Sequence, residues 1–196
     1  MDLIIDTETT GVTDLAFATH HNYKKWPRLV QLAWILANEA GETMEGGAII
    51  YPLDFEIPLK ATQIHGISQQ QALNTGENIR ETLLALNQVM QQADTLVAHN
   101  LNFDLGILQS EALRQDLQLD WPRKRYCTVH MGRTYLQTVK GRKQGGFPKQ
   151  GDLYETLFGI TYGPKHNAHS DARACYHIFR HLKNKSHTNN TPHQNH

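Results

Sequence analysis

The chain opens with an apolar run that turns abruptly polar. Residues 3–5, Leu-Ile-Ile, are followed by Asp6 and, two positions later, by Glu8. Three consecutive branched aliphatic residues predict a strand with both faces buried, which we place at Leu3–Asp6. Because residues two apart in a strand share a face, the two carboxylates lie on the same side and repel each other. They require either a cation between them or open solvent.

Three further apolar segments predict strands, at Leu29–Leu36, Ala48–Tyr51 and Thr95–Ala98. The first two follow the opening strand without a helix in between, which predicts an antiparallel meander. The third follows a predicted helix and is expected to run parallel to the opening strand. Two connections show neither the alternation of a strand nor the spacing of a helix. Residues 12–28 form a long polar segment, and residues 52–68 are irregular and rich in turn residues.

Apolar residues at helical spacing predict five helices along the rest of the chain. The clearest of them has Ile79, Leu83 and Leu86 on one face. Strands followed by alternating helices and a strand predict an α/β domain. The polar residues 184–196 predict a disordered tail, so the domain is expected to span residues 1–183. The predicted helices are 79–92, 102–114, 128–138, 151–159 and 168–183.

Composition adds the class of protein. With 39% hydrophobic and 19% charged residues, the chain is typical of a water-soluble globular protein. No apolar run is long enough to span a membrane, and the start of the chain lacks the pattern of a signal peptide. The two cysteines, Cys127 and Cys175, show no metal-type spacing and are predicted to be reduced thiols in a cytoplasmic protein.

Charge is balanced overall but unevenly distributed. The 19 basic and 19 acidic residues cancel, yet no Asp or Glu occurs from Trp121 to Gly151. Such a basic block can hold a phosphate backbone, although a solvated loop is the preferred interpretation of the block alone. If Arg142 and Lys143 contact phosphates, replacing both should weaken binding uniformly across sequences and flatten its salt dependence. The block contains Arg123, Lys124, Arg125, Arg133, Lys140, Arg142, Lys143 and Lys149.

Two more carboxylates stand where ligand sites form. Asp104 follows the strand Thr95–Ala98 and lies in the first turn of the next helix, where an Asp also simply complements the helix dipole. Asp171 shares a helix face with the apolar residues that follow it, so it is expected to point toward the core. Taken singly, a satisfied buried Asp explains it equally well. If the strands are adjacent and parallel, however, Asp104 converges with the first two carboxylates at the carboxyl edge of the sheet.

Four acidic side chains around one point predict a metal site. Carboxylate oxygens are hard ligands that suit Mg²⁺ or Mn²⁺, and the sequence lacks the Cys/His cluster typical of zinc sites. Four carboxylates exceed what one Mg²⁺ usually takes from protein. They suit a pair of ions about 4 Å apart, which stabilises the attacking and the leaving oxygen of a phosphoryl displacement. The predicted ligands are Asp6, Glu8, Asp104 and Asp171.

A general base is the remaining requirement, and two histidines stand near Asp171. On a helix, His169 lies about 200° around the axis from Asp171 and points away from it. His166 precedes the helix on a loop and can swing toward the cations. Since an unperturbed histidine has a pKa of about 6.5, His166 is the preferred base. His169 is interpreted as a surface or packing residue.

Taken together, these residues resemble a known family, the DEDDh or DnaQ-like 3′–5′ exonucleases, which include polymerase proofreading domains. An Asp-x-Glu pair alone is a weak signal, but four matching segments in order over residues 3–182 are a strong one. The resemblance implies a ribonuclease-H-like fold, a mixed five-stranded sheet flanked by helices, with its fifth strand near Arg125–Thr128. The matching segments are DTETTG at 6–11, IHGIS at 64–68, HNLNFD at 99–104 and HNAHSD at 166–171.

The resemblance also implies roles for individual residues. The four carboxylates would hold two Mg²⁺ or Mn²⁺ ions, and His166 would be the base that helps release nucleoside monophosphates from the 3′ end of nucleic acid. Phe103 could stack on a base, although a core aromatic is an equally good interpretation. The expected substrate contacts are Thr7, Thr9, His65, Asn100 and Phe103.

Other functions of the same fold stay open. A catalytically silent module that binds nucleic acid or a polymerase would be free to lose the five residues, yet all five are present. An endonuclease or integrase of this fold would have no need of the HNxxFD and His-x₄-Asp segments. The expected partner is a nucleic acid 3′ end, single-stranded or frayed, with DNA favoured over RNA. A polymerase or repair partner is not specified by the sequence.

Overall fold

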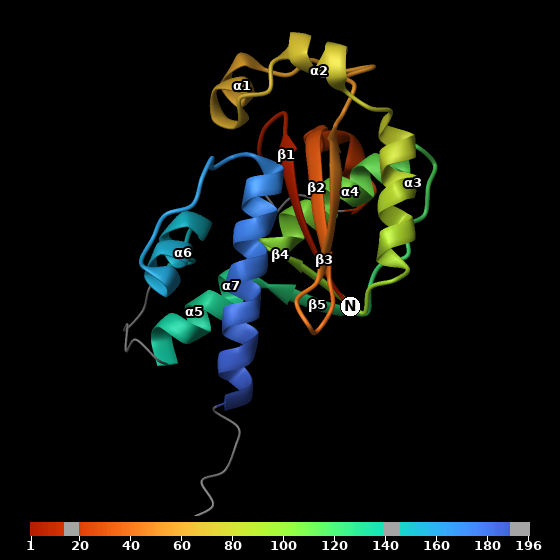
Figure 1. Ribbon diagram of the computed structural model, residues 1–196. Coiled ribbons are helices and arrows are strands. Elements are labelled where there is room, and N and C mark those ends of the chain that lie inside the picture. The colour runs from red at the N-terminus through yellow and green to blue at the C-terminus, as the bar shows by residue number, and fades with distance from the viewer. Residues whose placement is uncertain (14–19, 139–145, 189–196) are drawn as a thin grey trace, which may run out of the picture.

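A computed structural model describes residues 1–13, 20–138 and 146–188 of the protein. Five strands form a central sheet with helices on both faces (Figure 1). The strands are β1 (Asp2–Thr9), β2 (Leu29–Ala37), β3 (Thr43–Ile49), β4 (Thr95–Ala98) and β5 (Lys124–Cys127). The helices are η1, a 3₁₀ helix (His20–Lys25), α1 (Leu59–His65), α2 (Gln69–Thr75), α3 (Ile79–Met90), α4 (Leu101–Arg114), α5 (Thr128–Thr138), α6 (Gln150–Phe158) and α7 (Ala168–Thr188).

The sheet is mixed, in the order β3-β2-β1-β4-β5. The strand β2 pairs antiparallel with both β1 and β3, whereas β4 runs parallel to β1, and β5 runs parallel to β4. The predicted meander, the parallel fourth strand and the five-stranded α/β fold are therefore confirmed. The fifth strand lies within one residue of the segment that the family resemblance implied.

β1 lies at the centre of the sheet because its apolar side chains pack against helices on both faces. Leu3 and Ile5 pack with α3 and α4 on one face of the sheet, whereas Ile4 packs with α7 on the other. All three side chains are 0% exposed. Because successive side chains of a strand alternate between faces, the even-numbered residues of β1 point toward α7 and the odd-numbered ones toward α4. This alternation continues into the polar residues that follow.

The structure differs most from the prediction in three places. The segment 52–68, expected to be irregular, contains α1, a seven-residue helix between Pro58 and the left-handed Gly66. These two turn residues hid a helix that is too short to show a clear apolar period. The third strand is Thr43–Ile49, not Ala48–Tyr51, because this edge strand is mostly exposed and is held by backbone pairing with β2. The last helix continues past Lys183 to Thr188.

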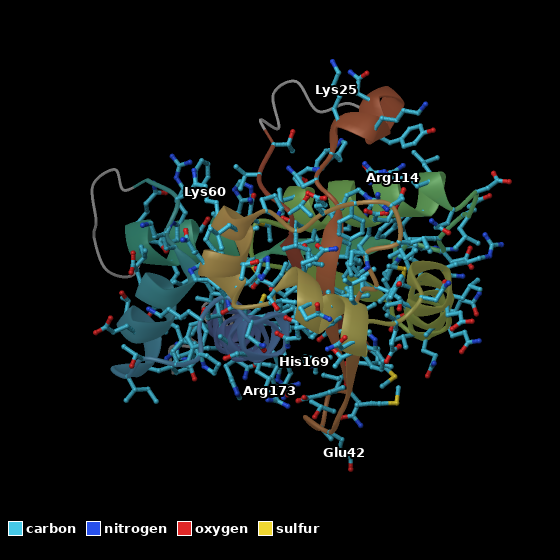
Figure 2. All side chains as sticks on the ribbon, turned by 90° about the horizontal axis from the view of Figure 1, so that it is seen from above. Lys25, Glu42, Lys60, Arg114, His169 and Arg173 are labelled. Atoms are coloured by element: carbon cyan, nitrogen blue, oxygen red, sulfur yellow. The ribbon has the colours of Figure 1, made fainter. Side chains whose placement is uncertain are left out.

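The connection between β1 and β2 contains η1 and is anchored to α4. Glu111 of α4 is 1% exposed and accepts hydrogen bonds from Arg28 Nε at 2.9 Å and Arg114 Nη1 at 3.1 Å. It also accepts one from the backbone N–H of Leu29 at 3.1 Å. Arg114, which lies beside η1 in Figure 2, donates in turn to two backbone carbonyls in and just after that helix. The long polar connection is thus tied to the helix that carries Asp104.

Part of the basic block lies outside the described residues. Arg123 directly precedes β5, whose first two residues are Lys124 and Arg125. Arg133 lies on α5, and Lys149 directly precedes α6. The proposed phosphate contacts Arg142 and Lys143 are among the residues that the structure does not describe, as is residue 140. Residues 189–196 of the predicted tail are outside it as well. Within the described chain, none of the helices has the length and apolar character needed to cross a membrane.

Candidate active site

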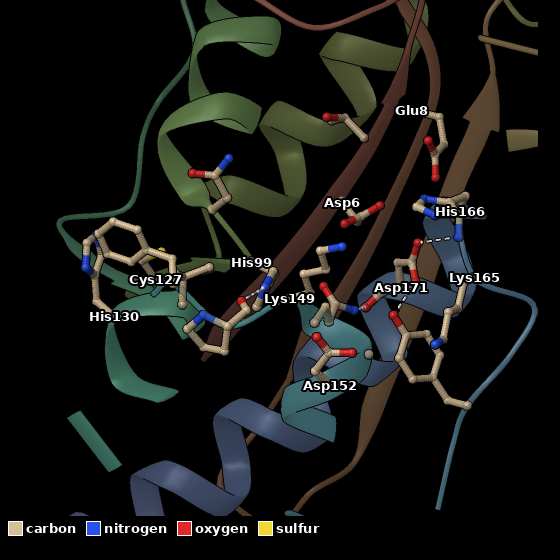
Figure 3. A pocket seen from close by; sticks show the side chains of 18 residues that line it. Asp6, Glu8, His99, Cys127, His130, Lys149, Asp152, Lys165, His166 and Asp171 are labelled. Atoms are coloured by element: carbon tan, nitrogen blue, oxygen red, sulfur yellow. Dashed lines mark hydrogen bonds between the residues drawn. The ribbon is translucent and has the colours of Figure 1, made fainter. Parts of the chain in front are cut away.

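The α7 face of β1 gathers four of the predicted site residues. Asp6 and Glu8 have the same parity as Ile4 and therefore face α7, whose first turn carries Asp171. A carboxylate oxygen of Glu8, one of Asp171 and a ring nitrogen of His166 all lie within 4.8 Å of one another. Figure 3 shows these side chains and Asp6 around one end of a cavity. The spacing is suitable for a metal ion.

Both carboxylate oxygens of Asp171 are held by the segment that precedes α7. Tyr162 Oη donates a hydrogen bond to Oδ1 at 2.7 Å, and the backbone N–H of His166 donates to Oδ2 at 2.8 Å. His166 has a φ of 58°, in the left-handed region, where histidine is one of the more tolerant residues. Gln150 Nε2 donates to the Asp171 carbonyl at 2.7 Å. Each carboxylate oxygen retains acceptor capacity for a cation.

Asp104 approaches from the opposite face of β1. It is 4% exposed, and its Oδ1 accepts a hydrogen bond from Thr7 Oγ1 at 2.8 Å. Thr7 has the opposite parity to Asp6 and Glu8, so its hydroxyl faces α4, as the alternation requires. Asp104 is not a member of the close group formed by Glu8 and its neighbours on the α7 side. Thr7 thus links the two layers within the site.

Burial and mutual repulsion dominate the electrostatics of the four carboxylates. The pKa of Asp6 is raised well above its ordinary value by burial, then by Asp104, Asp171 and Glu8. Burial, followed by Asp171 and Asp104, raises the pKa of Glu8 to about 8. Burial raises the pKa of Asp104 to about 7, although the hydrogen bond from Thr7 opposes this shift, and burial also raises the pKa of Asp171. Four mutually repelling buried acids are a donor set that fits hard divalent cations.

The two candidate bases lie in different surroundings. His166 is exposed and belongs to the close group with Glu8 and Asp171. The pKa of His169 is lowered by burial and then by Arg173, and Arg173 forms an ion pair with Glu45 of β3. His169 and Arg173 are neighbours in Figure 2. His169 therefore faces β3 rather than the carboxylates, as the helix geometry predicted.

The predicted substrate contacts separate into two groups. Thr7 and Asn100 line the cavity. Asn100 has φ 69° and ψ 47°, a left-handed conformation that asparagine tolerates, and it turns the chain from β4 directly into α4. Thr9 and Phe103 do not line the cavity. Thr9 Oγ1 donates to the Gly11 carbonyl at 2.6 Å.

Phe103 and His65 are packed into the protein. The Phe103 ring is partly buried against the core between the sheet and α3 and α4, with its centre 6.4 Å from that of Trp26. His65 is 7% exposed and accepts a hydrogen bond at Nδ1 from the Ile67 N–H at 3.1 Å. Its buried Nε2 makes no hydrogen bond of ordinary geometry among the described residues, although the Thr9 backbone is close enough to raise the pKa of the ring. Burial and then the charge of His166 lower that pKa.

The sequence analysis missed several residues of the site. The cavity has a volume of about 800 Å³ and is lined by Asp6, Glu8 and Asp171, but not by Asp104. Lys149, Gln150, Tyr162 and Lys165 line it as well. From the sequence, Lys149 is recognisable only as a member of the basic block and not as a residue of the site. Tyr162 lies nine positions before Asp171 on an irregular segment, where neither the helix nor the strand period applies. Only the path of the chain before α7 brings its hydroxyl to the carboxylate.

Most of the chain matches a known protein family. The model RNase_T, described as "Exonuclease", matches residues 3–179. Two curated relatives cover most of the chain. The 3′–5′ exonuclease DinG of Bacillus subtilis is 28% identical over 185 residues, which are 93% of this chain and 18% of that protein. The DNA polymerase III subunit epsilon of Treponema pallidum is 26% identical over 180 residues, 89% of this chain and 72% of that protein.

A solved structure has the same fold. Exonuclease X, in complex with 5′ overhanging duplex DNA, superposes with a TM-score of 0.66 at 20% sequence identity. The match covers 95% of this chain and 93% of that one. By contrast, the chain spans only about a fifth of the length of DinG, so the activity of that protein as a whole does not transfer directly.

Proposed function

The chain belongs to the exonuclease family whose model it matches, and from that premise we propose that it is a 3′–5′ exonuclease. It would remove nucleoside monophosphates from the 3′ end of nucleic acid. The observation that carries the proposal is the close group of Glu8, Asp171 and His166, assembled from β1 and from the start of α7. A phosphodiesterase needs such a cluster of oxygen ligands beside a titratable base, whereas a purely structural fold does not.

The residues that would hold metal ions are Asp6, Glu8, Asp104 and Asp171. Their oxygens suit Mg²⁺ or Mn²⁺, and their pKa values are raised first by burial and, at Asp6 and Glu8, also by the neighbouring carboxylates. When bound, two such ions supply electrostatic stabilisation to the attacking and leaving oxygens of a phosphoryl displacement. Among the described residues, none of the four forms an ion pair with a Lys or Arg side chain, and four such acidic groups support a pair of ions more than a single one.

The protein groups have separate tasks in this proposal. Tyr162 and the His166 backbone N–H fix the orientation of the Asp171 carboxylate, and Thr7 does the same for Asp104. The exposed imidazole of His166 takes the proton from the attacking water and passes it to solvent. Lys149 and Lys165, which line the same cavity, are placed to bind the phosphates of the strand.

His166 could instead be a metal ligand, since its ring belongs to the close group. We favour the base because hard cations prefer the carboxylates and because the ring is exposed to the water from which the nucleophile comes. The variant His166→Ala separates the two roles. Loss of the base lowers turnover about 100-fold or more and leaves the Mg²⁺ requirement unchanged. A higher Mg²⁺ requirement with little loss of turnover at saturation would assign the ring to the metal.

The function itself is tested with the purified chain, Mg²⁺ or Mn²⁺ and a 5′-labelled oligonucleotide with a free 3′-hydroxyl. We expect stepwise shortening from the 3′ end, inhibition by a chelator, and no cleavage of a circular strand. The variant Asp171→Asn should abolish the activity, whereas Asp116→Asn, on a turn after α4, should not. Cleavage of the circle would indicate an endonuclease. No shortening with any divalent metal, on DNA or RNA, would leave the silent binding module as the explanation.

DNA is the proposed substrate, in preference to RNA. Exonuclease X, which shares the fold, was solved on duplex DNA, and one relative is a subunit of a DNA polymerase. Digestion of matched DNA and RNA strands in parallel tests this point. Faster degradation of the RNA strand would reverse the assignment.

A further inference from the structure

The cavity continues past the carboxylates to a second end of different chemistry. His130 and Phe147 line this end, and His130 lies remote from Glu8 and His166 in Figure 3. The Phe147 side chain is 60% exposed. Its ring meets the edge of His130 at right angles, with 5.4 Å between centres, and the Arg133 guanidinium lies over it at 5.0 Å.

An exposed phenylalanine by itself needs no explanation, because single apolar side chains are common on protein surfaces. Three further features distinguish Phe147. It lines the same cavity as Asp6, Glu8 and Asp171, the Arg133 cation stacks against its ring, and Lys149, two residues later, lines the cavity too. Figure 3 shows Lys149 extending into the cavity toward Asp6. Aromatic rings interleaved with cations are typical of surfaces that bind single-stranded nucleic acid.

A hydrogen bond from His99 holds the segment that carries Phe147 in place. Burial lowers the pKa of His99 to about 4, so its ring is neutral at physiological pH. One ring nitrogen lies 3.1 Å from the Pro148 carbonyl and the other 2.9 Å from Thr128 Oγ1. Because a carbonyl only accepts, Nε2 carries the proton and donates to Pro148, while Nδ1 accepts from the Thr128 hydroxyl. The backbone next to Phe147 is thereby fixed to the end of β4, directly before Asn100.

We propose that Phe147, flanked by His130 and Arg133, is a stacking platform for a base of the substrate strand on the 5′ side of the bond that is cut. The proposal rests on the exonuclease function and specifies its substrate. A base can stack on this ring only if it is unpaired, so the preferred substrate is a single-stranded 3′ end long enough to reach from the carboxylates to Phe147. Lys149 neutralises the backbone along that path, and Arg133 does so beside the Phe147 ring.

The test measures whether removing the Phe147 ring and removing one base have non-additive effects on binding affinity. A 5′-fluorescent oligonucleotide of about ten nucleotides is titrated by anisotropy in the absence of divalent metal, first intact and then with a single abasic residue at each position in turn. For the wild-type protein we expect one abasic position upstream of the 3′-terminal nucleotide to weaken binding about tenfold. In Phe147→Ala, binding of the intact strand is weaker by the same factor, and the abasic residue at that position has no further effect.

Two more variants complete the test. Phe147→Trp retains a π face and should retain the abasic effect. Ile160→Ala removes an apolar side chain that is similarly exposed, at 62%, but does not line the cavity, and should leave both affinities at the wild-type level. Additive effects of Phe147→Ala and every abasic position would overturn the platform, even if the protein degrades DNA. Coupling at one position in a protein that degrades no substrate would support the platform and reject the exonuclease function.

Discussion

At the scale of single residues, the site depends on groups that hold the carboxylates in place. Asp171 accepts hydrogen bonds from Tyr162 and from the His166 backbone, one on each oxygen. Asp104 accepts one from Thr7. These bonds fix which lone pairs remain for a cation, so the geometry of the ligands is set before any ion arrives.

Tyr162 is therefore expected to act as a positioning residue. In Tyr162→Phe the ring is kept but the hydrogen bond to Asp171 is lost. Because a hydrogen bond to a charged group contributes about 1.5–3 kcal/mol, we expect the Mg²⁺ concentration for half-maximal activity to rise about tenfold or more. Turnover at saturating Mg²⁺ should change much less. Titration of the initial rate with Mg²⁺ measures both quantities.

A matched control for this variant is Tyr135→Phe, on α5, whose ring packs against His181 instead of the site. It should leave the Mg²⁺ requirement unchanged. If Tyr162→Phe lowers the melting temperature but not the Mg²⁺ affinity, the hydroxyl is a fold-stabilising group and not a positioning one.

Protonation of the carboxylates should couple stability to pH and to metal. The pKa values of about 8 for Glu8 and about 7 for Asp104 exceed the unfolded values of about 4.3 and 3.9. The folded state then binds protons more tightly than the unfolded state. The resulting stabilisation is fully present below about pH 4 and is lost as the pH rises through about 7 to 8.

Metal-free protein is therefore expected to melt at a lower temperature at about pH 8.5 than at about pH 6, measured by circular dichroism. Added Mg²⁺ or Mn²⁺ should raise the melting temperature more at the higher pH, since cations then bind without displacing protons. The metal effect should shrink in Glu8→Gln and persist in Glu81→Gln, an exposed residue of α3. An equal metal effect in Glu8→Gln would contradict the assignment.

At the scale of elements, the strand period of β1 and the starting points of two helices bring the site together. The strand period of β1 sends Asp6 and Glu8 to α7, and Thr7 to α4. The helix α4 begins just after the carboxyl end of β4. The backbone N–H of Ala168, the first residue of α7, donates to the Gln31 side chain of β2 at 3.0 Å, which fixes where that helix starts. Asp171 consequently falls next to Glu8.

The anchor between α4 and η1 leads to an element-scale prediction. Glu111 is a buried carboxylate that joins Arg28 and Arg114. In Glu111→Gln the two guanidinium groups lose their shared anion, and we expect the free energy of unfolding to fall by about 3 kcal/mol in urea titrations. Glu77→Gln, an exposed site, should change it by less than about 0.5 kcal/mol. A small effect at Glu111 would mean that packing around Trp26 is sufficient to hold η1.

At the scale of the whole molecule, zero net charge makes the local cations decisive. Lys149 and Lys165 line the cavity within a neutral protein. If both contact phosphates, the double variant Lys149→Gln, Lys165→Gln should reduce the slope of log affinity against log salt by about 2. Lys183→Gln, whose ammonium pairs with Asp2 at the opposite end of β1, should leave the slope unchanged. A slope unaltered in the double variant would place the strand elsewhere.

The predictability of the fold differed from element to element. β1, β2 and β4 were recognisable because each is an apolar run buried on both faces, and α5 matched its predicted bounds because its period is regular. β3 and α1 were misjudged for a common reason. An exposed edge strand and a seven-residue helix bury too few side chains to impress a period on the sequence.

The sequence by itself determined the order of the main strands and helices and the alternation along β1, and it supplied the candidate acidic residues, because these follow from local periods and from residue chemistry. Only the tertiary structure decided how these residues are grouped, with Glu8, Asp171 and His166 in one close group and Asp104 hydrogen-bonded to Thr7. It also brought Tyr162 to Asp171 and Phe147 into the cavity. The physical reason is that these residues lie on irregular segments, whose paths are set by long-range contacts and leave no repeating pattern in the chain.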